Sequence, residues 1–189
     1  NHMFLPDKSQ CEGNWDKRLY QDDATDYIGQ VERYNQELDY ALVKPYDSDM
    51  TMQDRVVGES WADGNILGHA TKDALQIYMS GDTPVYKMGV STGRQSGTID
   101  RIDANYTKYC PTINGEGIKT TATSATGDSG GPHYVTTKLD GVLITGIHVG
   151  TSTSQVGTKT CSGVDLKLAS TSLSTPAYKM VDIDSLQFG

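Results

Sequence analysis

The sequence has no long apolar run and few basic residues, and these two absences argue against two broad classes of partner. No hydrophobic stretch approaches the roughly 20 residues that a helix needs to span a bilayer, so we expect no membrane partner. The 16 Lys and Arg residues are outnumbered by 24 Asp and Glu residues, which gives a net charge of −8. An acidic surface repels phosphate backbones, so nucleic acid is not an expected partner either.

Cysteine is scarce, and its number is odd, since the chain has only three. Cys110 and Cys161 could form a disulfide. Cys11 would then be left with a free thiol, an intermolecular bond or a partner that is missing from this chain. Residues 105–107 fit the glycosylation sequon, which mildly favours secretion.

The histidines do not form a recognisable metal-binding motif. The sequence contains no HExxH, and His69 and His133 have no partners at the spacing of metal ligands. We therefore expect both of them at the surface or in turns, and we expect neither a metal nor a cofactor.

The apolar pattern is mostly that of short strands. Residues 27–34 alternate apolar and polar side chains, and residues 39–45 form a second short strand that ends at its proline. Residues 46–79 are polar and predict a connector with one helical turn near residues 52–57. Further strands are predicted at residues 84–90, 96–102, 133–137, 141–150 and 176–183. Short strands at regular spacing indicate a β-barrel or β-sandwich rather than parallel βαβ units.

The segment GDSGGP, residues 127–132, raises the question whether Ser129 is a nucleophile. A glycine-rich turn with only a structural role would explain it. The segment also satisfies the G-x-S-x-G pattern of α/β-hydrolases, which requires a buried strand before the serine and a helix after it. Pro132 and the β-branched residues beyond it are poor helix formers, so this second interpretation does not suit the context.

Four segments in a fixed order resemble the chymotrypsin-like serine proteases, closest to the bacterial streptogrisin-type and glutamyl endopeptidase members. They are DYALVKP at 39–45, a hairpin-like stretch at 81–99, GDSGGP at 127–132 and GIHVG at 146–150. The resemblance implies an all-β fold of two antiparallel Greek-key β-barrels without a C-terminal helix. It also implies a secreted serine endopeptidase that hydrolyses polypeptides through an acyl-enzyme.

The family uses a catalytic triad in the chain order His, Asp, Ser. The resemblance therefore makes Ser129 the nucleophile and Asp39 the residue that orients the base. The only histidine before Asp39 is His2, within Asn-His-Met at the start of the chain. That tripeptide could be a cloning remnant, but the spacing favours a chain that begins one residue before the catalytic histidine. The first barrel would then lack its N-terminal strands, and a missing N-terminal segment could complete it.

The same resemblance assigns the groups around the nucleophile. The backbone N–H groups of Gly127 and Ser129 would form the oxyanion hole, where glycine allows the backbone to approach the substrate closely. Asp128 would pair either with a freed N-terminal amine or with a nearby basic group, and the sequence leaves these two alternatives open.

Substrate-binding residues are predicted from the positions that line the family's specificity pocket. Thr123 at its base carries no charge, so a preference for basic P1 residues is not expected. His148 in GIHVG matches the histidine that contacts an acidic P1 side chain in glutamyl endopeptidases, although it could also be a strand histidine packed against the core. Thr126 and Thr151 could supply hydroxyl groups beside it. Val149 and Gly150 continue the strand that edges the cleft.

Three domains follow from this interpretation. Residues 1–50 would be the remainder of the N-terminal barrel, 51–79 an inter-barrel connector, and 80–189 the C-terminal barrel that carries the nucleophile. The competing interpretation is a non-catalytic trypsin-fold binding protein, or an inactive fragment that lacks a functional base. The presence of both Asp39 and Ser129 favours the enzyme.

Overall fold

The computed structural model describes residues 18–20, 27–35, 38–46, 54–56, 64–107, 114–151, 154–161 and 163–187. The chain divides into two compact units. Unit 1 covers residues 1–53 and 106–115, and unit 2 covers residues 54–105 and 116–189. The three domains suggested by the sequence remain a prediction. Neither described helix is long and apolar enough to cross a membrane.

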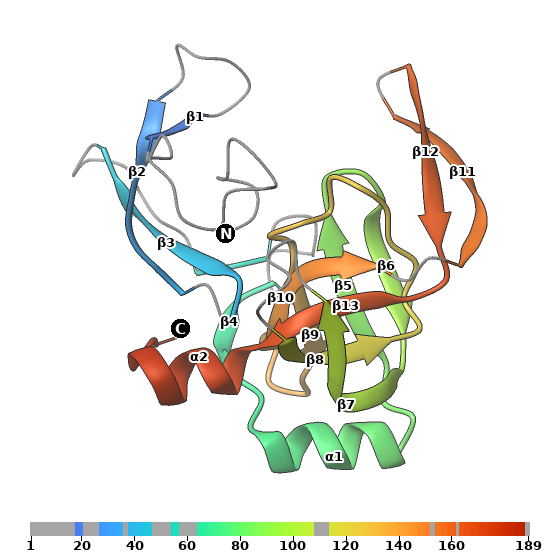
Figure 1. Ribbon diagram of the computed structural model, residues 1–189. Coiled ribbons are helices and arrows are strands. Elements are labelled where there is room, and N and C mark those ends of the chain that lie inside the picture. Colours follow the sequence, from blue (N-terminus) through green and yellow to red (C-terminus); the bar gives the residue numbers. More distant parts are fainter. Residues whose placement is uncertain are drawn as a thin grey trace. The chain divides into compact units, whose positions relative to one another are not determined.

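Unit 1 contains a three-stranded antiparallel sheet in the order β1-β2-β3 (Figure 1). The strands are β1 (Arg18–Tyr20), β2 (Tyr27–Asn35) and β3 (Tyr40–Pro45). Both strands predicted for this region are therefore confirmed. The turn before β3 is held by Asn35, whose Oδ1 accepts a hydrogen bond of 3.0 Å from the N–H of Leu38.

Unit 2 is organised around an eight-stranded sheet in the order β6-β5-β9-β10-β13-β8-β7, with β4 paired to β10 (Figure 1). Strand β4 pairs with β10 in parallel, whereas the pairings of β5 with β6 and β9, of β10 with β9 and β13, and of β13 with β8 are antiparallel. The strands are β4 (Ile66–His69), β5 (Val85–Gly89), β6 (Gly93–Gly97), β7 (Ile99–Thr107), β8 (Asn114–Thr120), β9 (Pro132–Thr136), β10 (Val142–Thr151) and β13 (Ser172–Pro176). The central strand β10 thus has β9 and β13 as neighbours, and these three strands carry much of the candidate site.

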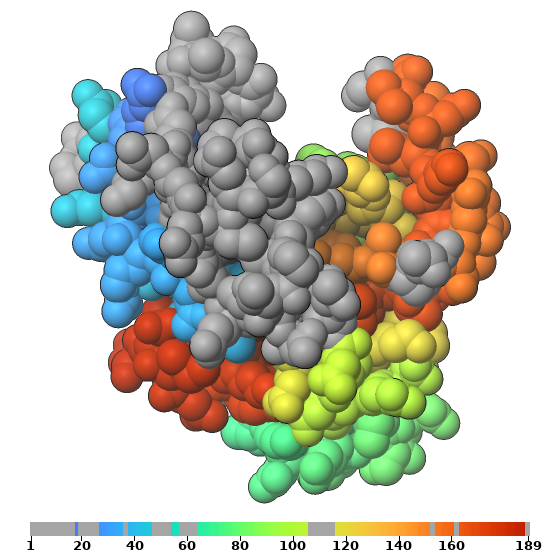
Figure 2. All heavy atoms as spheres, viewed as in Figure 1, coloured from blue at the N-terminus to red at the C-terminus, as the bar shows by residue number. Residues whose placement is uncertain are grey.

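A separate two-stranded hairpin, β11 (Gln155–Cys161) and β12 (Val164–Ala169), follows β10 in the chain. It projects from the rest of unit 2 as an arm, coloured orange in Figures 1 and 2. Val156 and Val164 are exposed on it. Lys159 ties the hairpin to the turn after β5, since its Nζ donates a hydrogen bond of 3.2 Å to the Thr92 carbonyl oxygen.

Two buried hydrophobic clusters form the core of unit 2. The first joins α1 to the sheet through Leu75, Val85, Ile99, Ile118 and Val135, together with Ala70 and Tyr178. The second gathers Val56, Tyr134, Val142, Ile144 and Ala177. Since β9 and β10 contribute to these clusters, the strands that carry the candidate site are anchored by buried apolar side chains.

The connector predicted at residues 46–79 contains more regular structure than expected. Its helix, α1 (Lys72–Ser80), lies well after the helical turn predicted at residues 52–57. Thr71 caps the helix, because its Oγ1 accepts a hydrogen bond of 3.2 Å from the N–H of Ala74. Strong helix formers follow, and Leu75 buries the inner face in the first cluster. The prediction overlooked this combination of a capping threonine and a following run of helix formers.

The strand predicted at residues 176–183 is wrong, because these residues form most of a C-terminal helix, α2 (Ala177–Asp184). Alternating apolar residues and two β-branched side chains suggested a strand. The side chains that become buried, at Ala177, Tyr178 and Met180, instead follow a helical spacing. The helix packs against β10 and β13, and this tertiary contact outweighs the weak local preference.

Candidate functional site

Ser129 lies half-buried in the turn that precedes β9. Two backbone hydrogen bonds fasten this turn to β10. The N–H of Gly130 donates to the carbonyl oxygen of His148 at 2.9 Å, and the N–H of His148 donates to the carbonyl oxygen of Gly131 at 2.8 Å. The structure therefore brings together the serine motif and the GIHVG strand, which are separate in the sequence.

The backbone around Ser129 requires glycine at position 127. Gly127 has a φ of +96°, in the left-handed region where side chains other than hydrogen are strained. A Cβ atom there would also overlap the Ser91 hydroxyl group. That hydroxyl donates a hydrogen bond of 2.7 Å to the Thr126 carbonyl oxygen, so it holds the preceding residue of the turn. The oxyanion-hole role of the Gly127 and Ser129 N–H groups remains a prediction.

Asp128 forms a buried ion pair with Lys87 of β5. The Lys87 Nζ and Asp128 Oδ2 atoms are 2.6 Å apart, and both side chains are fully buried. The Thr92 hydroxyl contacts both, at 2.7 Å from Lys87 Nζ and 2.8 Å from Asp128 Oδ2. Of the two partners that the sequence left open, the structure thus shows a basic group from within the same unit.

Asp128 is further held by backbone donors from two directions. The N–H groups of Ser91 and Thr92 donate to Oδ1, each at 3.0 Å, and the N–H of Ala125 donates to Oδ2 at 2.9 Å. Burial tends to raise the pKa of the Asp128 carboxyl, but Lys87 and these donors hold that pKa below its ordinary value. The ionised carboxylate therefore joins the serine turn to the end of β5.

His133 is the functional candidate that sequence reasoning missed. It was expected at the surface or in a turn, but it lies on β9 with no exposed surface. Its Nε2 lies 3.2 Å from the Nδ1 of His148, which is only 2% exposed. The available signal was its position: His133 and His148 lie on two strands predicted next to each other in the sequence, at residues 133–137 and 141–150. His69 is also no turn residue, since it ends strand β4 and is half-buried.

The two imidazole rings of His133 and His148 lie nearly in one plane. Their planes differ by 13° and their centroids are 5.4 Å apart. The centroid separation exceeds the distance between the nitrogens by about two ring radii, as expected for rings joined edge to edge by an N–H···N hydrogen bond. Burial, together with positive charge at His148 and Lys87, holds the pKa of His133 well below its ordinary value. His133 is therefore a neutral partner with a single N–H.

Thr151, one of the residues predicted to bind substrate, and Ser124, the neighbour of another, both contact the Thr171 backbone. The Thr171 carbonyl oxygen accepts hydrogen bonds from the Ser124 hydroxyl at 2.8 Å and from the Thr151 hydroxyl at 3.0 Å. Ser124 and Ala169 also exchange two backbone hydrogen bonds. The segment that contains Thr123 is thereby joined to the end of β10 and to the segment before β13.

The exposure of the predicted substrate-binding residues varies. Thr123 and Gly150 are partly exposed, and Thr126 and Thr151 are exposed. Val149, in contrast, is only 8% exposed. Substrate atoms could therefore reach the threonines and Gly150 more readily than the Val149 side chain.

The remaining triad residues do not share a unit with Ser129. Asp39 belongs to unit 1, where it is buried and precedes β3 with a φ of 53°. His2 and Cys11 lie outside the described residues, as do Cys110 and the side chain of Cys161. The triad and the disulfide therefore remain predictions. Among the described residues, no cluster of three or more His, Cys, Asp or Glu side chains could hold a metal ion.

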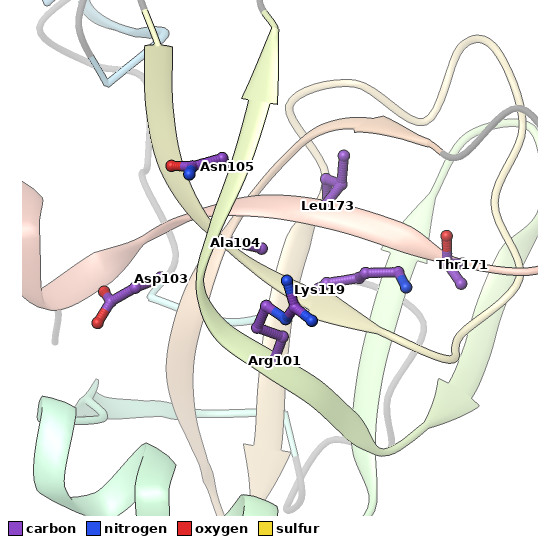
Figure 3. Close-up of a pocket in the computed structure, with 7 residues that line it drawn as sticks. All are labelled: Arg101, Asp103, Ala104, Asn105, Lys119, Thr171 and Leu173. Carbon is purple, nitrogen blue, oxygen red and sulfur yellow. The ribbon is translucent and has the colours of Figure 1, made fainter.

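A pocket of about 340 Å³ on unit 2 involves none of the predicted site residues (Figure 3). Its lining residues are Arg101, Asp103, Ala104, Asn105, Lys119, Thr171 and Leu173. Two of its charged groups are already in ion pairs: Lys119 with Asp100 at 2.7 Å, and Asp103 with Lys72 at 2.6 Å. Arg101 is the third charged residue that lines this pocket.

Comparison with known proteins identifies the fold of this chain. No protein-family model and no curated protein sequence matches the chain. Among solved structures, the chain is similar to Cellulomonas bogoriensis chymotrypsin, with 19% identity and a TM-score of 0.61 over 86% of this chain and 79% of that one. It is also similar to a glutamic acid-specific serine protease described as using a histidine triad in substrate binding. Here the identity is 22% and the TM-score 0.60, over 86% of this chain and 74% of that one.

A third similar structure is the Nocardiopsis protease, with 18% identity and a TM-score of 0.54 over 82% of this chain and 70% of that one. At these identities the likeness establishes the fold. The chain thus has the mostly antiparallel β fold of the chymotrypsin-like bacterial serine proteases, as its motifs predicted.

Proposed function

We propose that this chain, which has the fold of chymotrypsin-like proteases, is a serine endopeptidase. The observation that carries the proposal is the construction of the serine turn. A glycine at positive φ, a buried Asp128–Lys87 pair and two hydrogen bonds to β10 hold Ser129 in place. So many contacts to one turn are expected where a nucleophile must be preorganised.

In the proposed mechanism, Ser129 Oγ attacks the carbonyl carbon of the scissile peptide bond. His2 takes the hydroxyl proton and then passes it to the leaving amine, while Asp39 orients the imidazole and stabilises its charged form. The N–H groups of Gly127 and Ser129 stabilise the oxyanion. Water then hydrolyses the acyl-enzyme by the same proton transfers in reverse order.

We further propose that the enzyme prefers Glu at P1. His148 offers an imidazole beside the Ser129 turn, and the hydroxyl groups of Thr126 and Thr151 are exposed on adjoining segments. A protonated imidazole and hydroxyl donors together suit a carboxylate. Similarity to a protease specific for glutamic acid supports this preference, as does the contact between His148 and a second histidine, His133. Uncharged Thr123 offers no partner for Lys or Arg.

The proposed setting is extracellular, with polypeptides as substrates. The sequon at residues 105–107 and the similarity to bacterial proteases support it. A disulfide between Cys110 and Cys161 would suit an oxidising compartment.

The test of the catalytic proposal is labelling of the folded chain with a fluorophosphonate, followed by mass mapping of the modified residue. Labelling at Ser129 is expected, with loss of labelling in both Ser129→Ala and His2→Ala. Ser154→Ala, which removes an exposed serine elsewhere in unit 2, is the matched control and should label normally. A folded chain that does not label would leave the trypsin-fold binding protein as the better description.

The Glu preference is tested with a peptide library on unlabelled enzyme from the same preparation. Cleavage should concentrate after Glu, and His148→Gln should lower kcat/KM for Glu substrates by about 10–100-fold, since it removes a charged hydrogen-bond donor. His69→Gln is the control. Equal cleavage after Leu and Glu in the unmodified enzyme would show that His148 is a packed core histidine.

A further inference from the structure

Two polar atoms, one in the histidine pair and one on the neighbouring strand β13, are buried and have no hydrogen-bond partner in the part of the chain that the structure describes. They are Nδ1 of His133 and Oγ of Ser174, on strands β9 and β13. Leaving a buried polar atom unsatisfied costs its full desolvation energy, so native proteins rarely do so without a reason. One atom is on an imidazole that contacts His148, and the other is on a hydroxyl that can both donate and accept.

The strand register places both groups on one face of the sheet. On β10, Gly146 lies opposite His133 of β9, and His148 lies opposite Ser174 of β13. Cross-strand partners share a face, as do residues two apart on one strand, so the three side chains point the same way.

Gly146 places no side chain between these groups. A Cβ atom built on Gly146 would lie 2.9 Å from Ser174 Oγ, so the hydroxyl lies over this glycine. His133 approaches the same glycine from the opposite strand. No side chain of residue 146 therefore separates the Ser174 hydroxyl from the His133 ring.

We propose that the Ser174 hydroxyl ends a buried hydrogen-bond relay that runs through one bridging water and His133 to His148. Ser174 is thus a positioning residue, and it determines which nitrogen of His133 carries the proton. A small polar site with two unsatisfied groups is suited to hold such a water. The role of the relay in substrate binding rests on the proposed Glu preference, but its existence does not.

The relay has two proton arrangements. When His148 is neutral, His133 donates its Nε2–H to His148 Nδ1, and the bridging water, which accepts from the Ser174 hydroxyl, donates to His133 Nδ1. The proton of His148 is then on Nε2. When His148 takes up one proton to face a carboxylate, it carries N–H groups on both nitrogens. Its Nδ1–H must then donate to His133 Nε2, so the single proton of His133 is on Nδ1 and is donated to the bridging water, which donates in turn to the Ser174 hydroxyl.

A hydroxyl is suited to this exchange because it accepts in one arrangement and donates in the other. The charged groups that adjoin His133 are few. Lys87 faces it from β5, opposite His133 in the strand register, and is paired with Asp128. His133 itself stays neutral in both arrangements, and only its tautomer changes.

The direct test is nitrogen NMR of the histidine side chains in the Ser129→Ala protein, which cannot digest itself. In this parent, both nitrogens of His133 should show the shifts of hydrogen-bonded nitrogens. Adding Ser174→Ala should shift His133 Nδ1 and mix its tautomers. The matched control is Ser172→Ala, which removes another buried serine of the same strand, one whose hydroxyl is already bonded to Thr120 at 2.7 Å. It should leave the His133 signals unchanged.

The parent spectrum alone can overturn the relay, even if Ser174→Ala does not fold. A shift of His133 Nδ1 typical of a nitrogen without a hydrogen bond would do so, as would identical His133 signals with and without the Ser174 hydroxyl. In the active enzyme, Ser174→Ala should raise KM for Glu substrates about tenfold and leave kcat nearly unchanged, a loss equal to one weakened charged hydrogen bond. Absence of cleavage after Glu in every variant would overturn the proposed specificity, while the NMR result still decides the relay.

Discussion

At the scale of single residues, the serine turn depends on the buried ion pair between Lys87 and Asp128. Isolated burial of the Lys87 ammonium or the Asp128 carboxylate would cost several kcal/mol, and their pairing at 2.6 Å together with the backbone donors offsets that cost. Burial lowers the pKa of Lys87, and the contact with Asp128 opposes that shift. Removing one partner leaves the other charge buried and unpaired.

Lys87→Met should therefore destabilise the protein by about 3–5 kcal/mol, because Asp128 would lose its counter-ion while its carboxylate stays buried. Urea unfolding followed by circular dichroism measures the change. Lys119→Met is the matched control, since Lys119 pairs with Asp100 at 2.7 Å at the surface. Its half-exposed ion pair should contribute about 0–1 kcal/mol. Equal effects of the two substitutions would contradict the argument.

His133 makes stability depend on pH. Its pKa in the folded protein is well below the ordinary value of 6.5, chiefly through burial, so the unfolded chain binds a proton that the folded chain does not. This contribution to stability is fully present above pH 6.5 and is lost as the pH falls below it. Below pH 6.5 the free energy of unfolding should fall less steeply with decreasing pH in His133→Gln than in the wild type. The difference between the two slopes should be up to about 1.4 kcal/mol per pH unit.

The measurement is urea unfolding of both proteins at pH 7 and pH 5. The stability difference between wild type and His133→Gln should shrink at pH 5, because only the wild type loses the His133 contribution. A constant difference would mean that His133 is not the group responsible.

At the scale of elements, helix α1 is determined mainly by local sequence signals, whereas helix α2 is determined mainly by tertiary contacts. Helix α1 has a capping threonine, an acidic residue in its first turn and a glycine at its C-cap. Helix α2 follows Pro176 and has no side-chain cap, and it depends on burial of Ala177, Tyr178 and Met180. Substitutions at the ends of α1 should therefore lower stability by the amounts that are typical of lost helix caps.

Thr71→Ala should destabilise unit 2 by about 0.5–2 kcal/mol, since it removes the hydroxyl that accepts from the Ala74 N–H. Thr71→Ser keeps that hydroxyl and should be close to wild type. Thermal unfolding of the three proteins compares them. A Thr71→Ser protein as unstable as Thr71→Ala would mean that the threonine methyl group, rather than the cap, matters.

At the scale of the whole molecule, the net charge of −8 opposes the local preference proposed for the site. An acidic protein repels acidic peptides at long range, even if a histidine attracts one carboxylate at short range. Salt screens the long-range part first, because the Debye length falls from about 30 Å at 0.01 M to about 10 Å at 0.1 M.

The kcat/KM for a peptide with one P1 Glu and several further acidic residues should therefore rise severalfold between 0.01 M and 0.15 M salt. A peptide with the same P1 Glu but neutral flanks is the control, and its kcat/KM should change little. A fall in kcat/KM with salt for the acidic peptide would instead indicate a local attraction that dominates the net charge.

The sequence by itself determined the mostly β character, most of the strands and the turn around Ser129. These features depend on short-range physics: period-two alternation for strands, and glycine with its left-handed φ at Gly127 for the turn. The order of four motifs was enough to predict the chymotrypsin-like fold, which the similar structures confirm.

Only the tertiary structure decided which polar residues are buried together. Lys87 and Asp128 are 41 residues apart, and His133 and His148 are 15 apart. A lysine or histidine in an alternating strand has the same local sequence pattern whether its side chain is exposed to water or buried in the assembled sheet. The same limit explains α2, where packing on β10 and β13 outweighed a local pattern typical of a strand. The physical reason is that burial is a property of the assembled sheet, and no short segment carries it alone.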